Sequence, residues 1–142
     1  MAARAPSSSS LAHEVRETLG RVVRRLRAEP GPPVPLLTVL GRLDREGPSS
    51  VSDLAAAERM RPQSMAQTVR ELETAGLVSR RADPEDGRRA FVELTATGHE
   101  RLRATRAARE DWLSETLNRE LDADERELLR RALMLLGRIA DA

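Results

Sequence analysis

The sequence contains no cysteine and no lysine, and it has only two histidines and two large aromatic side chains. Without cysteine, disulfides, thiolate metal sites and a thiol redox switch are excluded. The two histidines, His13 and His99, are too few and too far apart to suggest a zinc site. Because Phe91 and Trp112 are the only aromatics, a stacking platform for single-stranded nucleic acid is disfavoured.

No stretch has the length and apolar character of a signal peptide or a membrane span, so we expect a cytoplasmic protein with no membrane partner. A length of 142 residues suits one compact domain with helical extensions. The net charge is only +1, and every basic residue other than histidine is arginine. If the protein binds nucleic acid, its basic groups must therefore be concentrated locally.

Turn residues and helical periodicity divide the chain into six expected helices. Residues 1–10 are small and polar and are expected to form a disordered tail, with Ser10 as the N-cap of the first helix. After this tail we expect a first helix from residue 11 that is broken at residues 29–33, a second over residues 34–46 and a short third opened by Ser50. The fourth is opened by Pro62 and ended by Gly76, the fifth is capped by Thr95 or Thr97 and runs to about residue 118, and the last is capped by Asp122 or Asp124.

Between the fourth and fifth helices, the segment from Leu77 to Gly98 has the pattern of a β-hairpin. We expect strands over residues 77–81 and 89–95, since the second alternates between apolar and polar residues. Asp83-Pro84 and Asp86-Gly87 mark the turn between them. Two helices joined by a short turn and followed by such a hairpin form a winged helix-turn-helix. The predicted fold is therefore mainly α with a small β-hairpin wing (α+β), and residues 34–98 form the DNA-binding domain.

The fourth helix and the wing carry the side chains expected to contact double-stranded DNA. An outward face with amides and arginines can read base edges in the major groove, because glutamine pairs with adenine and arginine with guanine. Serines near helix N-termini favour phosphates, and Arg88 at the wing tip can enter the minor groove, with Asp86 expected to hold it extended. The candidate DNA-binding residues are Ser50, Ser52, Arg61, Gln63, Ser64, Gln67, Thr68, Arg70, Arg80, Arg81, Asp86, Arg88 and Arg89.

The two ends of the chain have the pattern of an interface between subunits. The first helix is amphipathic, and the last has a wide leucine face around Leu128, Leu135 and Ile139. A single neighbouring helix would not cover that face, so residues 11–30 and 99–142 are expected to form a homodimerisation region. A two-fold dimer places two recognition helices in successive major grooves, so we expect an inverted-repeat operator.

One block of residues resembles the wing signature of the MarR family of bacterial transcriptional regulators. It consists of Asp86-Gly-Arg88 followed, after five residues, by Leu94-Thr95-Ala-Thr-Gly98. Ser52-Asp-Leu-Ala55, the segment from Leu72 to Val78 and Arg80 also fit, and the similarity covers nearly the whole chain. The resemblance implies an obligate homodimer that binds palindromic promoter DNA, usually as a repressor.

The resemblance also implies release of DNA by a small aromatic or phenolic effector. Such ligands bind between the dimerisation region and the winged helix, where this chain offers Leu37, Leu40 and Trp112, with His13 or Arg16 as polar partners. Packing is the alternative role for the leucines. The absence of cysteine excludes the peroxide-sensing switch of one branch of the family.

Two other function classes remain open at this point. A winged-helix module that binds protein instead of DNA is the main alternative, although amides and arginines are unusual on a protein-binding surface of this kind. An enzyme is disfavoured, because no nucleophile–base pair, metal cluster or phosphate-binding loop is present in the sequence and no cofactor is implied.

Overall fold

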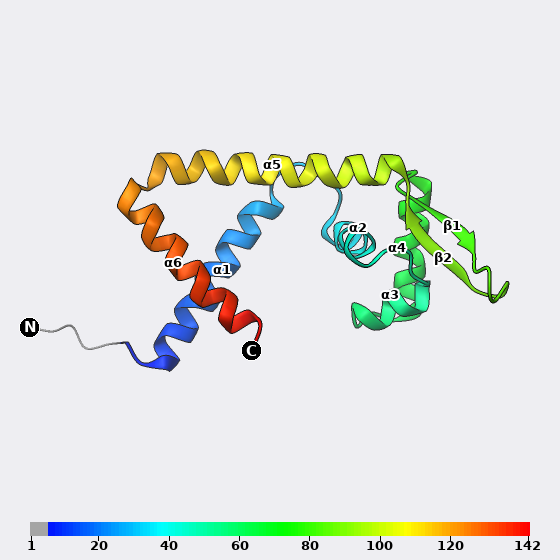
Figure 1. The fold of residues 1–142 in the computed structure, drawn as a ribbon, viewed down its shortest axis with the longest axis horizontal. Coiled ribbons are helices and arrows are strands. Elements are labelled where there is room, and N and C mark those ends of the chain that lie inside the picture. The colour runs from blue at the N-terminus through cyan, green and yellow to red at the C-terminus, as the bar shows by residue number, and fades with distance from the viewer. Residues whose placement is uncertain (1–5) are drawn as a thin grey trace, which may run out of the picture. The chain divides into compact units, whose positions relative to one another are not determined.

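The computed structural model describes residues 6–142, which form a mainly helical fold with one two-stranded antiparallel sheet (Figure 1). The chain divides into two compact units, which are described separately: residues up to Ala107, and Ala108–Ala142. The elements are α1 (Ser8–Arg27), α2 (Val34–Glu46), α3 (Val51–Ala57), α4 (Pro62–Thr74), β1 (Val78–Ala82), β2 (Ala90–Leu94), α5 (Ala96–Glu120) and α6 (Ala123–Ala140). Both the expected fold class and the order of the elements are confirmed.

Helix α1 begins at Ser8, three residues before Leu11, its expected first residue. The side chain of Ser7, not of Ser10, accepts a hydrogen bond from the backbone N–H of Ser10 at 3.2 Å, which makes Ser7 the cap. Any of four consecutive serines could cap a helix, and extending it to Ser8 adds backbone hydrogen bonds such as Leu11 N to Ser7 O at 3.0 Å. Residues 8–10 are thus helical and not a disordered tail, while residues 1–5 lie outside the described part of the chain.

The hydrophobic core of the first unit lies between α2, α3, α4 and the hairpin. Leu40, Leu54, Met65, Leu72 and Val92 are completely buried there. On α2, Arg42 donates through Nε to Glu58, the residue that ends α3, and through Nη1 to Glu46 at 2.7 Å. These hydrogen bonds raise the pKa of Arg42 above its ordinary value. They hold the end of α3 against α2, and so fix where the turn into α4 begins.

The turn between α3 and α4 and the end of α4 both use left-handed backbone. Arg59 has φ +52° and is the one non-glycine residue with positive φ among residues 6–142. Pro62 opens α4, as expected from its fixed φ and missing N–H. Gly76 ends the helix region with φ +73°, a conformation that glycine adopts without steric cost.

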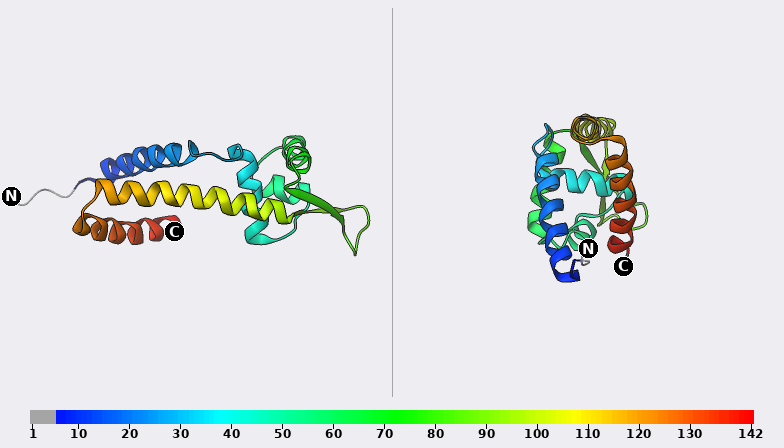
Figure 2. Two further views of the ribbon diagram at one scale, coloured as in Figure 1. Left: turned by 90° about the horizontal axis from the view of Figure 1, so that it is seen from above. Right: turned by 90° about the vertical axis from the view of Figure 1, so that its left-hand side faces the viewer.

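The hairpin is shifted by one residue from its expected start and is slightly shorter at its second strand. Val78 pairs with Leu94 and Ala82 with Ala90, which leaves Arg89 in the turn. Ser49 adds a pairing that the sequence pattern did not indicate: it exchanges backbone hydrogen bonds with Val92 at 2.8 and 3.0 Å. The root of β2 is therefore bound on both sides, while the rest of the hairpin projects beyond the helices (Figure 2).

The start of α5 docks onto the junction between α4 and β1 through Thr95 and Gly98. The Thr95 hydroxyl donates to the carbonyl of Gly76 at 2.7 Å and accepts from the N–H of Gly98 at 3.0 Å, so Thr95, not Thr97, caps α5. A Cβ atom on Gly98 would lie 2.0 Å from the carbonyl oxygen of Leu77, so any other residue type at this position would force the backbone to move. The hydrogen bonds of Thr95 and the close approach of Gly98 explain why the Leu94–Gly98 block of the sequence contains these two residue types.

The second unit contains the later part of α5 and the whole of α6, which turns back from the end of α5 (Figure 1). Asp122 caps α6 in a complete capping box with Glu125, as the sequence predicted for one of its two candidates. No residue of α6 is buried, and Leu128 and Ile139 are each 68% exposed. In the first unit, α1 likewise buries no residue and exposes Leu11 and Leu19.

Candidate nucleic-acid interface

Helix α4 has one face in the core and an opposite face that is polar and exposed. Met65, Val69 and Leu72 are completely buried on the inner face, as the periodicity predicted. Because the buried side anchors the helix, the side chains on the other side are held at fixed positions along it. The exposed set comprises Gln63, Ser64, Gln67, Arg70, Glu71 and Thr74.

An open hollow of about 600 Å³ lies where α3, α4 and the hairpin meet. Ser52 comes from α3, Gln63 from the first turn of α4, and Arg80, Arg88 and Arg89 from the hairpin. All five were expected to contact DNA, and the fold brings them to one surface although they lie up to 37 residues apart, from Ser52 to Arg89. The first turn of a helix attracts anions, and arginine forms charge-assisted hydrogen bonds with phosphate, so this hollow can receive a phosphate backbone.

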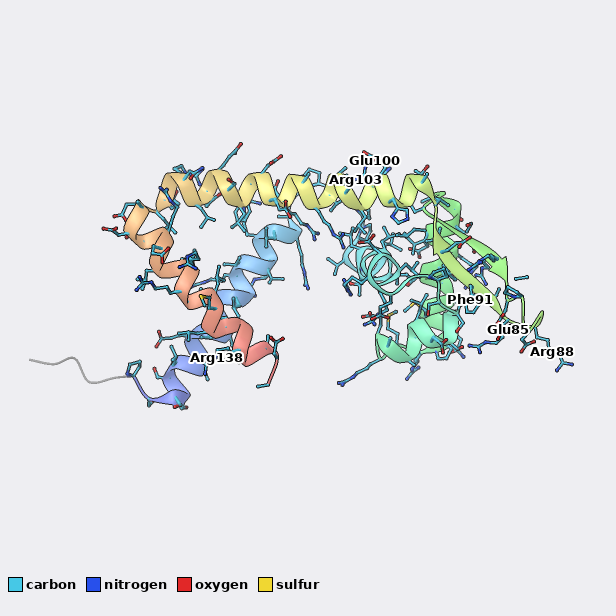
Figure 3. The ribbon with its side chains drawn as sticks, viewed as in Figure 1. Glu85, Arg88, Phe91, Glu100, Arg103 and Arg138 are labelled. Atoms are coloured by element: carbon cyan, nitrogen blue, oxygen red, sulfur yellow. The ribbon has the colours of Figure 1, made fainter. Side chains whose placement is uncertain are left out.

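Arg88 lies at the tip of the hairpin and points away from the rest of the molecule (Figure 3). Among residues 6–142, its guanidinium makes no hydrogen bond or ion pair. Asp86 accepts a hydrogen bond from the backbone N–H of Arg88 at 3.0 Å, so the expectation that Asp86 holds the Arg88 side chain is wrong. Its carboxylate shapes the turn instead, as Asp83 does by accepting from the N–H of Glu85 at 2.9 Å.

The other arginines of the hairpin are paired with carboxylates. Arg80 lies 3.0 Å from Glu73 at the end of α4, and Arg89 lies 3.3 Å from Asp53 on α3. Each pair joins the hairpin to a helix of the helix-turn-helix and directs an arginine along the exposed surface. In each pair, at least one of the two side chains is more than a third exposed to solvent. The pairs therefore contribute little to stability, and their main effect is on the direction of the arginine side chains.

Three of the expected DNA contacts lie elsewhere or are engaged within the protein. Ser50 also lines the hollow, but it is only 5% exposed and its hydroxyl accepts from the N–H of Asp53 as the cap of α3. Thr68 is 8% exposed and donates to the carbonyl of Ser64, because it shares the buried side of α4 with Met65 and Leu72. Arg81 is on the opposite face of the hairpin from Arg80, over the ring of Phe91 and 3.4 Å from Glu93. We leave these three out of the interface proposed below.

The residues expected to line an effector pocket are not brought together by the first unit. Leu37 and Leu40 belong to the hydrophobic core, so packing is their role here. His13 is exposed on α1, and Arg16 forms an exposed ion pair with Glu17 at 2.8 Å. Trp112 belongs to the second unit.

Asp53 and Glu73 are parts of this surface that the sequence pattern did not reveal. Asp53 lies in the first turn of α3 and Glu73 near the end of α4, positions that by themselves predict no part in DNA binding. Their arginine partners lie 36 and 7 residues along the chain, and only the fold shows that they meet. The pairing of Gln67 with Glu71, in contrast, follows the i, i+4 spacing of a helix and could have been predicted.

Comparison with known proteins shows to which family the chain belongs. The model of the MarR family matches residues 34–90, which span α2 to the start of β2. The chain is 37% identical over 138 residues to HTH-type transcriptional regulators of Mycobacterium leprae and Mycobacterium tuberculosis, covering 95% of this chain and 96% of each relative. The chain belongs to the MarR family.

Solved structures agree with this assignment. A crystal structure of a protein named as a transcriptional regulator from Pseudomonas aeruginosa PA01 is 42% identical, with a TM-score of 0.85 over 94% of this chain and 96% of that chain. A MarR family protein from Bacillus stearothermophilus shares the fold, with a TM-score of 0.77 at 20% identity over 94% of this chain and 95% of the other.

The protein is therefore a DNA-binding transcriptional regulator of the MarR family and not an enzyme. The predicted family and function class are confirmed. Within residues 6–142, no group of three or more acidic or histidine side chains could hold a metal ion. None of the helices in that range combines the length and apolar character needed to cross a membrane.

Proposed function

We propose that this MarR-family protein is a homodimeric repressor that binds inverted-repeat operators in promoter DNA of a bacterial cytoplasm. The observation that carries the proposal is the exposed polar face of α4 together with the adjoining hollow, which Gln63 of α4 lines with Arg80, Arg88 and Arg89 of the hairpin. In this arrangement, α4 enters the major groove and Arg88 reaches the adjacent minor groove.

The wing's part in binding can be tested with Arg88→Ala. Because the Arg88 guanidinium makes no hydrogen bond or ion pair within residues 6–142, its loss should leave the fold unchanged and weaken binding to every duplex by about five- to tenfold at low salt. Arg103→Ala is the matched control, since Arg103 pairs with Glu100 on the outer face of α5, away from the hairpin (Figure 3). Equal affinities of the two variants in a gel-shift titration would remove the wing from the proposed interface.

The exposed apolar faces of α1 and α6 support dimerisation. In α6, Leu133, Met134 and Leu135 are 55%, 63% and 57% exposed, and in α1, Val22 and Val23 are 39% and 41% exposed. Such contiguous apolar surface is unusual on a monomer and is typical of protein–protein contacts. A second copy of this chain would cover it and would place two α4 helices about 10–10.5 base pairs apart on DNA.

Dimerisation can be tested with Leu135→Glu, which puts a charge into the exposed apolar face of α6. We expect analytical ultracentrifugation to show a shift from dimer to monomer at micromolar concentration, with helicity by circular dichroism unchanged because the residue is not buried in the chain. Operator affinity should fall with the dimer. A wild-type protein that sediments as a monomer would contradict the proposal directly.

Repression and sequence preference can be tested by selecting binding sites from DNA and by measuring a reporter gene. Selection from a randomised duplex pool should recover an inverted repeat, and a reporter behind that sequence should be less active when the protein is present. Affinity should fall steeply with added salt, because arginine–phosphate contacts release counterions. A motif without two-fold symmetry would refute a dimer on a palindrome, and an activated reporter would refute repression.

Control by a small effector is a narrower part of the proposal. A MepR-like protein crystallised with pseudoligands is similar to this chain, at 26% identity and a TM-score of 0.55 over 93% of this chain and 92% of that one. We expect an aromatic or phenolic acid to raise the thermal midpoint of the free protein and to lower its operator affinity. Titration of a panel of benzoates and phenols tests this, and a panel that changes neither quantity contradicts it.

A further inference from the structure

Three neighbouring side chains on the outer face of α4 form a hydrogen-bonded chain. Arg70 donates through Nη2 to Oε1 of Gln67 at 2.9 Å, and Gln67 donates through Nε2 to Oε1 of Glu71 at 3.3 Å. All three residues are exposed, and they border an open depression of about 410 Å³. The spacings of three and four residues put Arg70 and Glu71 one helical turn beyond Gln67, on either side of it.

This chain determines which way the Gln67 amide faces. The oxygen and the NH₂ group of glutamine have similar size, so an exposed amide can turn by 180° and exchange its donor and its acceptor. Arginine offers only donors, and an ionised glutamate offers only acceptors. A turned amide would bring NH₂ against the Arg70 guanidinium and oxygen against the Glu71 carboxylate. Only one orientation of Gln67 is therefore compatible with both neighbours.

The orientation leaves a defined set of hydrogen-bonding groups for DNA. The amide oxygen of Gln67 keeps a second lone pair, and its NH₂ group keeps a second hydrogen. One acceptor beside one donor matches the major-groove edge of adenine, where the N6 amino group donates and N7 accepts. Neither guanine nor cytosine offers that pair in the major groove, because guanine presents two acceptors and cytosine one donor.

We propose that Gln67 reads an adenine in each half-site, and that Glu71 and Arg70 are positioning residues that fix its amide for this contact. The inference rests on the proposed docking of α4 in the major groove. It also explains why a carboxylate is present on a DNA-binding face. Glu71 repels the phosphates and lowers affinity for every sequence, but it restricts Gln67 to one of its two orientations.

The test is selection from a randomised duplex pool with the full-length wild type, Gln67→Ala, Glu71→Gln and Glu85→Gln. Glu85 is the matched control, because it is an exposed acid at the hairpin tip whose replacement removes one negative charge without touching Gln67 (Figure 3). In Gln67→Ala, the preference for one adenine per half-site should fall by about 5- to 150-fold, the range for loss of a bidentate base contact.

Glu71→Gln should separate positioning from charge. We expect it to bind all duplexes more tightly while losing at least about threefold of the same adenine preference, since a neutral amide at this position accepts or donates equally well. Glu85→Gln should bind more tightly with its preference unchanged. Circular dichroism should show the same helicity for all variants, because none of the substituted residues is buried.

The outcomes distinguish this inference from the proposed function. An unchanged adenine preference in Glu71→Gln would overturn the positioning role. Loss of a cytosine preference in that variant would instead make Glu71 a direct reader of the cytosine amino group, which also overturns it. A wild-type motif that lacks two-fold symmetry would refute the dimeric operator but leave the Gln67 comparison valid, since the preference belongs to each recognition helix separately.

Discussion

Replacing Gly98 by alanine should damage the protein more than any other single-methyl addition at its glycines. The new Cβ would be 2.0 Å from the carbonyl oxygen of Leu77, whereas a carbon–oxygen contact needs about 3.3 Å. Either the segment around Gly98 or the segment around Leu77 must therefore move by about 1.3 Å. The same oxygen accepts the N–H of Thr95 at 3.1 Å, and Leu77 is buried, so the movement disturbs a hydrogen bond inside packed structure.

The magnitude follows from three terms. Overpacking costs about 1–3 kcal/mol, and a disturbed hydrogen bond costs about 0.5–1.5 kcal/mol. Alanine regains nearly 1 kcal/mol over glycine through helix propensity. Together these terms give a net loss of about 0.5–3.5 kcal/mol, which corresponds to a fall of about 1–14 °C in thermal midpoint for a chain of this size.

Urea denaturation at one fixed protein concentration measures the effect, with Gly137→Ala as the matched control. Gly137 is also inside a helix, but a Cβ there would meet no atom within 4 Å, so this variant should gain up to about 1 kcal/mol from helix propensity. If Gly98→Ala were within about 0.5 kcal/mol of the wild type, the close approach of α5 to Leu77 would be wrong as a determinant of stability.

Two further predictions concern the same part of the molecule. Thr95→Val keeps the shape but loses both hydrogen bonds of the hydroxyl, so the free energy of unfolding should fall by about 1–3 kcal/mol in urea denaturation, while Thr97→Val, at an exposed position, should change little. Asp44 accepts from Arg106 at 2.8 Å, and this hydrogen bond lowers the pKa of Asp44 below its ordinary 3.8. Its stabilising effect is therefore present above pH 3.8 and is lost as the pH falls through the lower folded value, so the difference in stability between the wild type and Asp44→Asn should be present above pH 3.8 and should vanish in strong acid. A difference that grows as the pH falls would contradict the assignment.

The parts of the fold that depend on local signals were predictable from the sequence. Ser50, Pro62, Gly76 and Asp122 mark helix ends where the structure has them, because caps and breakers act within a few residues of themselves. Ser10 failed as a cap because four serines in succession offer equivalent caps, and local chemistry alone does not choose among them.

The candidate site was predictable in its residue types but less so in their roles. Thr68 could have been assigned to the core, since it follows Met65 by three residues and precedes Leu72 by four. The pairing of Asp53 with Arg89 spans 36 residues and depends on how the hairpin packs against α3, which no local pattern contains. The sequence predicted that the Asp86 carboxylate holds the side chain of Arg88. In a turn, however, the backbone N–H two residues away competes better for that carboxylate.

The two backbone hydrogen bonds between Ser49 and Val92 should divide the hairpin into segments that differ in mobility. At its root, the amide hydrogen of Val92 is enclosed between chain segments and should exchange slowly with solvent. Toward the tip, the chain is closed by the hydrogen bonds of Asp83 to Arg89 and of Arg89 to Asp86, on exposed backbone where exchange is fast. In the proposed interface, a stiff root would set where the wing meets the duplex, and a compliant tip would let Arg88 follow grooves of different width, so that one protein could bind operators of unequal local geometry.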